Sequence, residues 1–278
     1  MKVLYFIEIL VIAALSVDSP ASAAPMETGV LALRAEPQIR NRDHLREYAR
    51  RLPRSTVATE GNRIVWDLGG GIIDGRKCKR YRSKQDERNA GLDIRLPELT
   101  IRNGSVRQLW GGFIFRAAGG AVENMVWMNV GEDAVSTVVD RAPGFKAQGC
   151  TFHNDGDGDK SIQLNDARDA IVENCTIFGG TTGIRWQEHE TKDRADCYAR
   201  GNRFVGVETA HNVAGEETTL HLDDASETYD GVRKQVVTSY GAKIQQGKWT
   251  FESRPREGLR KTGKSDRKKR ASKRRRSR

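Results

Sequence analysis

Residues that could carry chemistry gather in the middle of the 278-residue sequence. Glu132 and Asp133 come first, Asp159 directly precedes Lys160, and Arg185 follows 25 positions after that lysine. Carboxylates are hard oxygen ligands of the kind that Ca2+ prefers, and lysine and arginine bind anionic groups. Because 25 residues nearly equals a sequence repeat of this region, we expect Lys160 and Arg185 to lie above one another, close to the acids.

Such a column suits the cleavage of a polysaccharide made of uronic acids. Ca2+ held by Glu132, Asp133 and Asp159 would bind the carboxylate of a sugar and acidify its C5 proton. Lys160 or Arg185 would remove the proton, and the glycosidic oxygen would leave by β-elimination. Either side chain acts as a base only when neighbouring positive charge lowers its pKa. We therefore expect Lys160 and Arg185 to bind substrate and to carry catalysis.

The run 155–159, Asp-Gly-Asp-Gly-Asp, resembles the start of a helix-loop-helix calcium loop. Lys160 stands at the sixth position, where that loop requires glycine. The glycines of the run indicate a tight turn instead. We expect the aspartates of this turn to add oxygen ligands to those of Glu132 and Asp133.

The elements that would position these residues follow a repeat of short apolar runs. Aligned asparagines and glycines mark it at intervals of 21, 25, 25 and 27 residues: Asn103, Asn124, Gly149, Asn174 and Gly201. A period in the twenties without intervening helices is typical of a solenoid. The leucine pattern of leucine-rich repeats is absent, whereas a parallel β-helix tolerates uneven turns. The sequence therefore predicts an all-β parallel β-helix.

Two further features belong to this predicted solenoid. Apolar residues of 43–52 recur at helical spacing, Asn41 or Asp43 can cap the helix, and Pro53 ends it, so we expect a short helix that caps the N-terminal end. Cys150 and Cys175 would stack on adjacent coils, either as a disulfide or as an apolar ladder.

The two ends of the chain differ from the middle. Lys2, the apolar run 3–17 and a small-x-small site at 21–23 are typical of an export signal, which predicts a secreted protein. Residues 254–278 hold 14 of the basic residues against two acids, so the rest of the chain is nearly neutral. We expect this tail to be disordered and to contact polyanions rather than a specific nucleic acid. The predicted segments are a signal peptide at 1–23, a cap region at 24–60, the β-helix at 61–253 and the tail at 254–278.

Three ordered motifs resemble those of the small pectate lyases of polysaccharide lyase family 3. They are the Val-Gly-Glu-Asp-Ala run at 130–134, Asp-Lys-x-Ile-Gln-x-Asn at 159–165, and Phe-Gly with a following arginine at 178–185. The resemblance covers about 110–185 and implies a right-handed parallel β-helix, Ca2+ dependence and cleavage of polygalacturonate. Carried over by position, it makes Glu132 and Asp133 calcium ligands.

The resemblance also implies roles for the two basic residues. Lys160 becomes a lysine that binds substrate or acidifies its proton, and Arg185 becomes the base or its partner. The sequence departs from the family where an upstream aspartate is expected, since 110–114 reads Trp-Gly-Gly-Phe-Ile. The lysine of Phe-Gly-Lys is replaced by Gly180, and the cysteine pair after the arginine is absent.

These departures leave two alternatives to a monomeric, secreted pectate lyase. One is a β-helix module that binds an anionic polysaccharide without cleaving it. The other is a β-helix glycoside hydrolase, for which Asp157 and Asp159 would be the only candidate acid pair.

Overall fold

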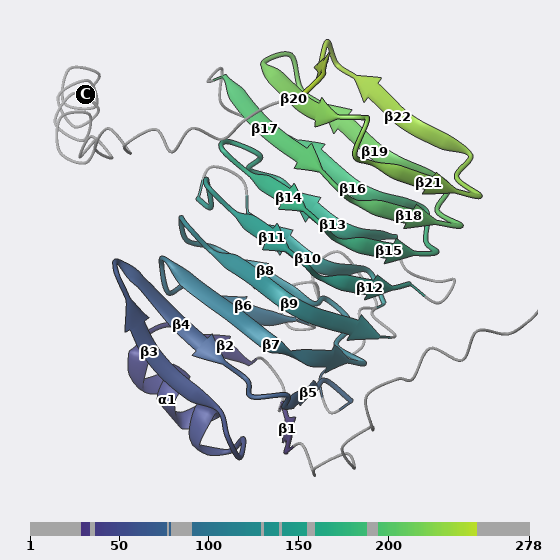
Figure 1. Cartoon of the computed structure of the whole chain (residues 1–278). Helices are drawn as coiled ribbons and strands as arrows, with labels where there is room; N and C mark the ends of the chain where they lie inside the picture. Colours follow the sequence, from purple (N-terminus) through teal and green to yellow (C-terminus); the bar gives the residue numbers. More distant parts are fainter. Residues whose placement is uncertain are drawn as a thin grey trace, which may run out of the picture.

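The chain folds into a right-handed parallel β-helix of about six turns with one short helix at its N-terminal end, as the sequence predicts. The structure, a computed structural model, describes residues 29–33, 37–76, 78, 91–128, 131–138, 141–154, 159–187 and 194–248. Figure 1 shows the coils stacked from α1 at one end to β22 at the other. In this described part, no helix combines the length and apolar character needed to cross a bilayer.

Two sheets run along the stack, and almost all of their strand pairs are parallel. The first sheet contains β1 (Val30–Ala32), β3 (Thr56–Glu60), β4 (Arg63–Asp67), β5 (Ile72–Asp74), β7 (Leu99–Arg107), β9 (Ala121–Met128), β11 (Lys146–Gln148), β12 (Thr151–His153), β14 (Ile171–Glu173), β15 (Thr176–Phe178), β17 (Ala195–Arg200), β18 (Arg203–Val205), β20 (Thr218–Asp223), β21 (Thr228–Asp230) and β23 (Lys243–Gln246). The second sheet contains β2 (Gln38–Ile39), β6 (Leu92–Ile94), β8 (Phe113–Phe115), β10 (Asp133–Thr137), β13 (Lys160–Leu164), β16 (Thr182–Gln187), β19 (Thr209–Ala214) and β22 (Lys234–Ser239).

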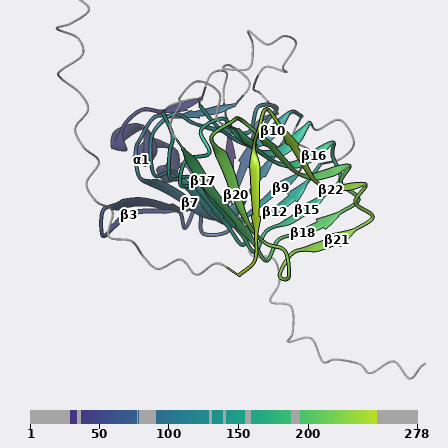
Figure 2. The ribbon, with the colours of Figure 1, turned by 90° about the horizontal axis from the view of Figure 1, so that it is seen from above.

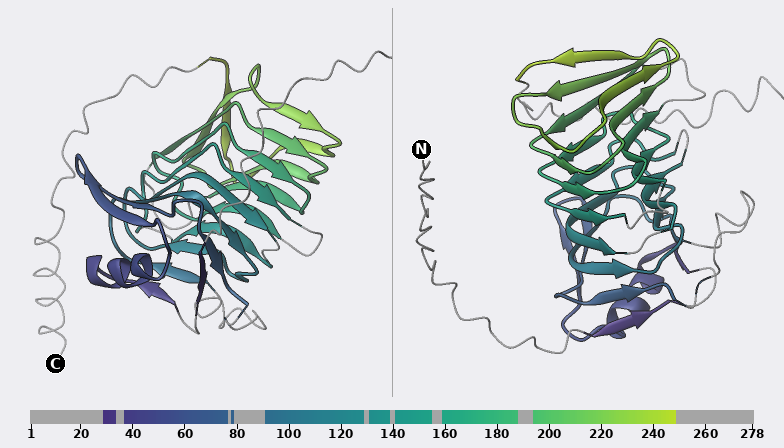
Figure 3. Two further views of the ribbon diagram at one scale, coloured as in Figure 1. Left: turned by 60° about the horizontal axis from the view of Figure 1, so that its bottom comes forward. Right: turned by 90° about the vertical axis from the view of Figure 1, so that its right-hand side faces the viewer.

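Each central coil contributes three strand segments. The chain runs through β11 and β12 of the first sheet, crosses to β13 of the second, and then repeats this path as β14, β15 and β16. Successive coils pair in register, for example Thr151 with Thr176 and Val135 with Ile162. The side views in Figure 3 show these coils as a regular stack.

The bend between the two segments in the first sheet explains the asparagine and glycine repeat. Asn103, Asn124, Gly149, Asn174 and Gly201 all have positive φ angles of 51–64°. Asparagine and glycine are the residues that adopt this left-handed conformation at low cost. The side chain of Asn124 donates to Asn103 Oδ1 at 3.4 Å, and a Cβ at Gly149 would lie only 2.6 Å from Asn124 Oδ1. The repeat therefore marks the bends at which the backbone turns one corner of the coil.

Inward-facing apolar side chains form one continuous core along the axis of the stack. Aromatic rings pack across coils, with Trp127 stacked on Phe152 at a centroid distance of 4.7 Å. Cys150 and Cys175 are buried on adjacent coils as free thiols. The structure therefore has these cysteines as an apolar ladder and not as a disulfide.

The N-terminal cap is α1 (Arg42–Arg50), close to its predicted range. Asn41 caps the helix, since its Oδ1 accepts from the backbone nitrogens of Asp43 at 3.1 Å and His44 at 2.9 Å. Leu45 and Ala49 are buried, so the amphipathic face covers the first coil. Figure 2 shows α1 on the opposite side of the molecule from β21 and β22.

The coils continue to the C-terminal end of the described chain. The sequence repeat fades after Val213, but the coils continue through β20, β21 and β22 to β23. Polar residues replace apolar ones at several positions in this end of the core. His211 and Glu227 are both fully buried, with His211 Nε2 3.4 Å from Glu227 Oε2, and Glu227 Oε1 also accepts from Asn202 Nδ2 at 2.9 Å. The hydrogen bonds within this buried group take the place of apolar contacts.

Candidate functional site

Asp133 and Lys160 lie directly opposite each other on the neighbouring strands β10 and β13. Lys160 Nζ is 3.5 Å from Asp133 Oδ1, and both side chains are almost completely buried. Each lies two positions before a core residue, Val135 or Ile162, and on the same face of its strand. Asp133 and Lys160 therefore stand where β10 and β13 begin, at the edge of the core. Lys160 therefore lies close to an acidic residue, as we expected from the sequence.

Lys160 has a second carboxylate partner. Its Nζ contacts Asp159 Oδ2, and the Asp159 side chain is about half exposed. The backbone nitrogens of Asp159 and Lys160 both donate to Glu132 O, at 3.1 and 3.0 Å. Glu132, Asp133, Asp159 and Lys160 thus come together at one corner between consecutive coils.

Small residues allow this corner to pack closely. A Cβ at Gly131 would overlap the indole ring of Trp110, and a Cβ at Gly112 would overlap the carbonyl oxygens of Asp133 and Ala134. The backbone nitrogen of Glu132 donates to Trp110 O at 3.0 Å. The Trp-Gly-Gly turn, which stands where the resembled family has an aspartate, therefore supports the backbone beneath Asp133.

Arg185 does not lie above Lys160, so the expected alignment of the two basic residues is wrong. Lys160 is in register with Thr182, and Arg185 is in register with Gln163. The 25-residue period holds on the first sheet, where Thr151 pairs with Thr176. The connection from β12 to β13 spans residues 154–159, whereas that from β15 to β16 spans only 179–181, which shortens the repeat on the second sheet. Three positions along a strand separate Lys160 from the level of Arg185, about 10 Å.

Arg185 belongs instead to a polar row on the outer face of the second sheet. Ser136, Gln163, Arg185 and Asn212 pair in succession across β10, β13, β16 and β19, and each is partly exposed. Arg185 is the one charged member of these four. Within the described part of the chain, its Nε is buried from solvent and has no hydrogen-bond partner. A buried donor without a partner is unfavourable, so this guanidinium is not fully satisfied within the described protein.

Sequence reasoning missed Ser136, Gln163 and Asn212 as neighbours of Arg185. Their separations along the chain are 27, 22 and 27 residues, because connections of different length interrupt the coils. The sequence signal that could have found them is the strand alternation itself. Each precedes or follows a core residue such as Val135, Ile162 or Val213 by one position.

The arrangement at the corner does not fit the calcium ion that the resemblance implies. The ammonium of Lys160 lies at the carboxylates of Asp133 and Asp159, where a cation between them would have to sit. In the described residues no three His, Cys, Asp or Glu side chains form a group that could hold a metal. Asp155 and Asp157, which were expected to add ligands, lie outside the described residues, as do the proposed signal segment and the basic tail.

Comparisons with known proteins assign no family to the chain. No protein-family model matches it, and no curated protein does so either.

Proposed function

We propose that this protein binds an acidic polysaccharide on the outer face of its second sheet and cleaves it by β-elimination, as a pectate lyase does. The observation that carries the proposal is the position of Arg185 as the single cation among Ser136, Gln163 and Asn212. A guanidinium matches a carboxylate with two parallel hydrogen bonds. Polar neighbours on both sides suit the hydroxyl groups of a sugar chain that crosses the strands.

Arg185 has a defined part in the elimination step. It would bind the carboxylate of the sugar that loses its C5 proton, and stabilise the negative charge that develops there. A solvent hydroxide or water takes up the C5 proton, and the electrons of the C5–H bond form the C4–C5 double bond. The bond from C4 to the glycosidic oxygen then breaks, and that oxygen takes up a proton from water. The buried ammonium of Lys160 would position β13 through Asp133 and Asp159, and its catalytic assignment stays a prediction.

Binding without cleavage is the second candidate function, and one observation favours it. Lys160 is almost completely buried and is paired with two carboxylates, so the second basic residue expected of a lyase does not reach the outer face in this arrangement. A binding module would need only Arg185 and its polar row.

One set of assays tests both candidates. Polygalacturonate would be incubated with the wild type, Arg185→Ala, Arg185→Lys and, as a control on the other sheet, the exposed Arg203→Ala, each with added calcium and with a chelator. An unsaturated product absorbs in the ultraviolet, and retardation in gels that contain the polymer reports binding. We expect Arg185→Ala to lose the absorbance and most of the retardation, Arg185→Lys to keep part of the retardation, and Arg203→Ala to match the wild type.

The results of these assays distinguish the lyase, the binding module and the hydrolase. Retardation without absorbance would leave the binding module, and new reducing ends without absorbance would indicate a hydrolase. Unchanged retardation of Arg185→Ala would overturn the proposed site. The calcium and chelator arms test the calcium dependence that the resemblance implies.

A further inference from the structure

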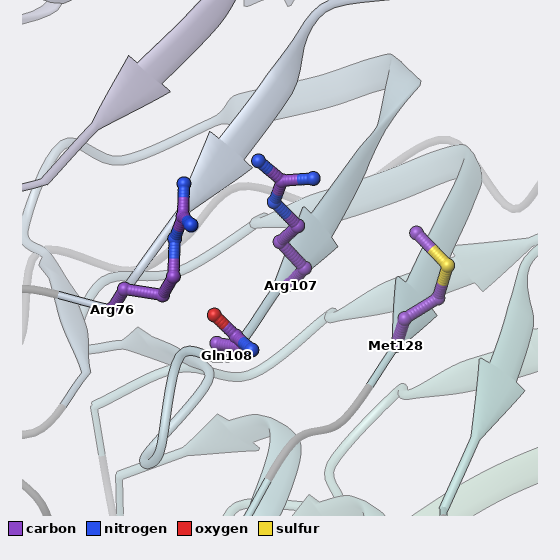
Figure 4. Close-up of a pocket in the computed structure, with 4 residues that line it drawn as sticks. All are labelled: Arg76, Arg107, Gln108 and Met128. Atoms are coloured by element: carbon purple, nitrogen blue, oxygen red, sulfur yellow. The ribbon is translucent and has the colours of Figure 1, made fainter.

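A separate pocket of about 300 Å3 lies beside the ends of β5 and β7. Its lining residues are Arg76, Arg107, Gln108 and Met128. Figure 4 shows the guanidinium groups of Arg76 and Arg107 next to each other, with Gln108 below them and Met128 farther along. None of these residues belongs to the row of Arg185.

Asp74 holds the two guanidinium groups in place. The Asp74 side chain is 2% exposed, and its Oδ2 accepts from Arg76 Nε at 2.8 Å and Arg107 Nε at 2.9 Å. Burial by itself would raise the pKa of Asp74, but hydrogen bonds from Arg76 and Arg107 lower it. The carboxylate therefore stays charged and orients both side chains before any ligand arrives, which reduces the entropy lost on binding.

Among the described residues, the charged groups of the pocket add up to a net positive site. One carboxylate faces two guanidinium groups, and Asp74 engages the Nε and Nη2 side of each. Each guanidinium has further N–H donors in the same plane, which match a carboxylate or another oxyanion. A compact anionic group is therefore the ligand chemistry that fits.

The wall of the pocket narrows the choice of ligand. Met128 pairs with Arg107 and with His153 on the outer face of the first sheet. From His153 the row of partly exposed side chains continues to Phe178 and then to Val205. The rings of His153 and Phe178 are stacked, with centroids 4.8 Å apart and planes at 3°. The negative faces of such rings attract C–H groups. An anionic group attached to a ring with an apolar C–H face fits this combination better than a small inorganic anion.

We propose that the pocket between Arg76 and Arg107 binds the carboxylate of an acidic sugar, whose ring lies over Met128 toward His153. The choice of a sugar acid rests on the proposed function, but the site is on the other sheet and uses different residues. A long acidic polymer would then contact the protein at two places, the row of Arg185 and this pocket. Two linked contacts would increase the apparent affinity for long chains over short ones.

A matched arginine elsewhere in the chain provides the control. Arg95 binds Asp93, two residues before it, as Arg76 binds Asp74, and Arg116 binds the same Asp93 as a second arginine. The side chains of Arg76 and Arg95 are 62% and 50% exposed. Arg95 does not line the pocket, so it differs from Arg76 in location rather than in local chemistry.

The experiment uses modification by an arginine-selective dicarbonyl reagent, read residue by residue with mass spectrometry. The full-length protein would be treated alone, with trigalacturonate, with its methyl ester, and with sulfate. We expect trigalacturonate to slow the modification of Arg76 at least about tenfold, which is the size of effect that hydrogen bonds to charged groups produce. The modification rate of Arg95 should not change. The methyl ester should protect neither arginine, and sulfate should protect Arg76 less than trigalacturonate does.

Three results would overturn the proposal. They are equal protection of Arg76 and Arg95, equal protection by the acid and its methyl ester, and protection by sulfate as strong as that by the sugar acid. The same measurement on Arg185→Ala keeps the two sites distinguishable. If trigalacturonate still protects Arg76 in the Arg185→Ala variant, the result supports the pocket, even if the variant is not retarded by the polymer. If the protection of Arg76 is lost in this variant, the pocket is not a separate site and the proposal is overturned.

Discussion

Lys160 is placed directly opposite Asp133 across the β10–β13 pair, and its ammonium lies between that carboxylate and the one of Asp159. The pair is almost completely buried at the edge of the core. A buried lysine with two acidic partners holds a strand in place, whereas Arg185, one coil further, faces outward. The structure thus separates the two basic residues into an inner and an outer position.

Lys160→Ala should therefore destabilise the fold. It leaves the buried Asp133 carboxylate without this ammonium, and removal of one partner of a buried pair costs about 3–5 kcal/mol. Lys160→Met combined with Asp133→Leu should recover most of the loss. Urea unfolding measures both. Arg46→Ala, which breaks the exposed pair with Asp43, should change the free energy of unfolding by less than about 1 kcal/mol. An equally small effect of Lys160→Ala would contradict the buried pairing.

Gly112→Ala should be far more harmful than Gly144→Ala. Both glycines have positive φ, +57° and +72°, so each substitution costs about 1 kcal/mol from the backbone conformation alone. A Cβ at Gly112 would also overlap the carbonyl oxygens of Asp133 and Ala134, whereas a Cβ at Gly144 meets no atom within 4 Å. Thermal unfolding should show a loss of several degrees more for Gly112→Ala. Similar midpoints for the two variants would exclude the close approach at Gly112.

Stability should depend on pH through Glu173. Burial by itself would raise the pKa of Glu173, but hydrogen bonds from Lys146 and Arg200 outweigh it and lower the pKa below its ordinary 4.5. The unfolded chain then binds the proton more readily than the folded protein. The contribution of Glu173 to stability is complete above about pH 4.5 and is lost as the pH falls below that value.

Denaturant unfolding between about pH 7 and pH 3 checks this dependence. The stability difference between the wild type and Glu173→Gln should be largest at neutral pH and should shrink on acidification. Lys146→Met removes a partner 2.8 Å from the carboxylate and should flatten the same dependence in part. A difference that grows toward low pH would have the wrong sign for this ion pair.

The thiols of the native protein should react slowly and should all be free. Burial, and to a lesser extent Asp74, raises the pKa of Cys78 to about 11, and burial raises the pKa of Cys175 and Cys197. The reactive thiolate is therefore scarce near neutral pH. A thiol reagent should modify the half-buried Cys78 first and the others only on unfolding. Titration of unfolded protein without reductant should find all four thiols, and two fewer would indicate a disulfide.

The overall architecture could be predicted because it depends on local rules. The bends at Asn103, Asn124 and Gly149 need residues that tolerate positive φ, and α1 needs a cap at Asn41 and an apolar stripe. Such requirements act within a few residues and leave a visible pattern. The buried group of His211, Asn202 and Glu227 could not be predicted, because these side chains satisfy one another only across coils.

By itself, the amino-acid sequence determined the repeat, the cap and the set of charged residues available to a site. Only the tertiary structure decided which of them meet. The connection 154–159 is longer than 179–181, and this difference shifts the register between β13 and β16. That shift pairs Lys160 with Thr182 and brings Arg185 beside Gln163. Connection lengths act through strand pairing between coils, so a constant period along the chain does not report which side chains are neighbours.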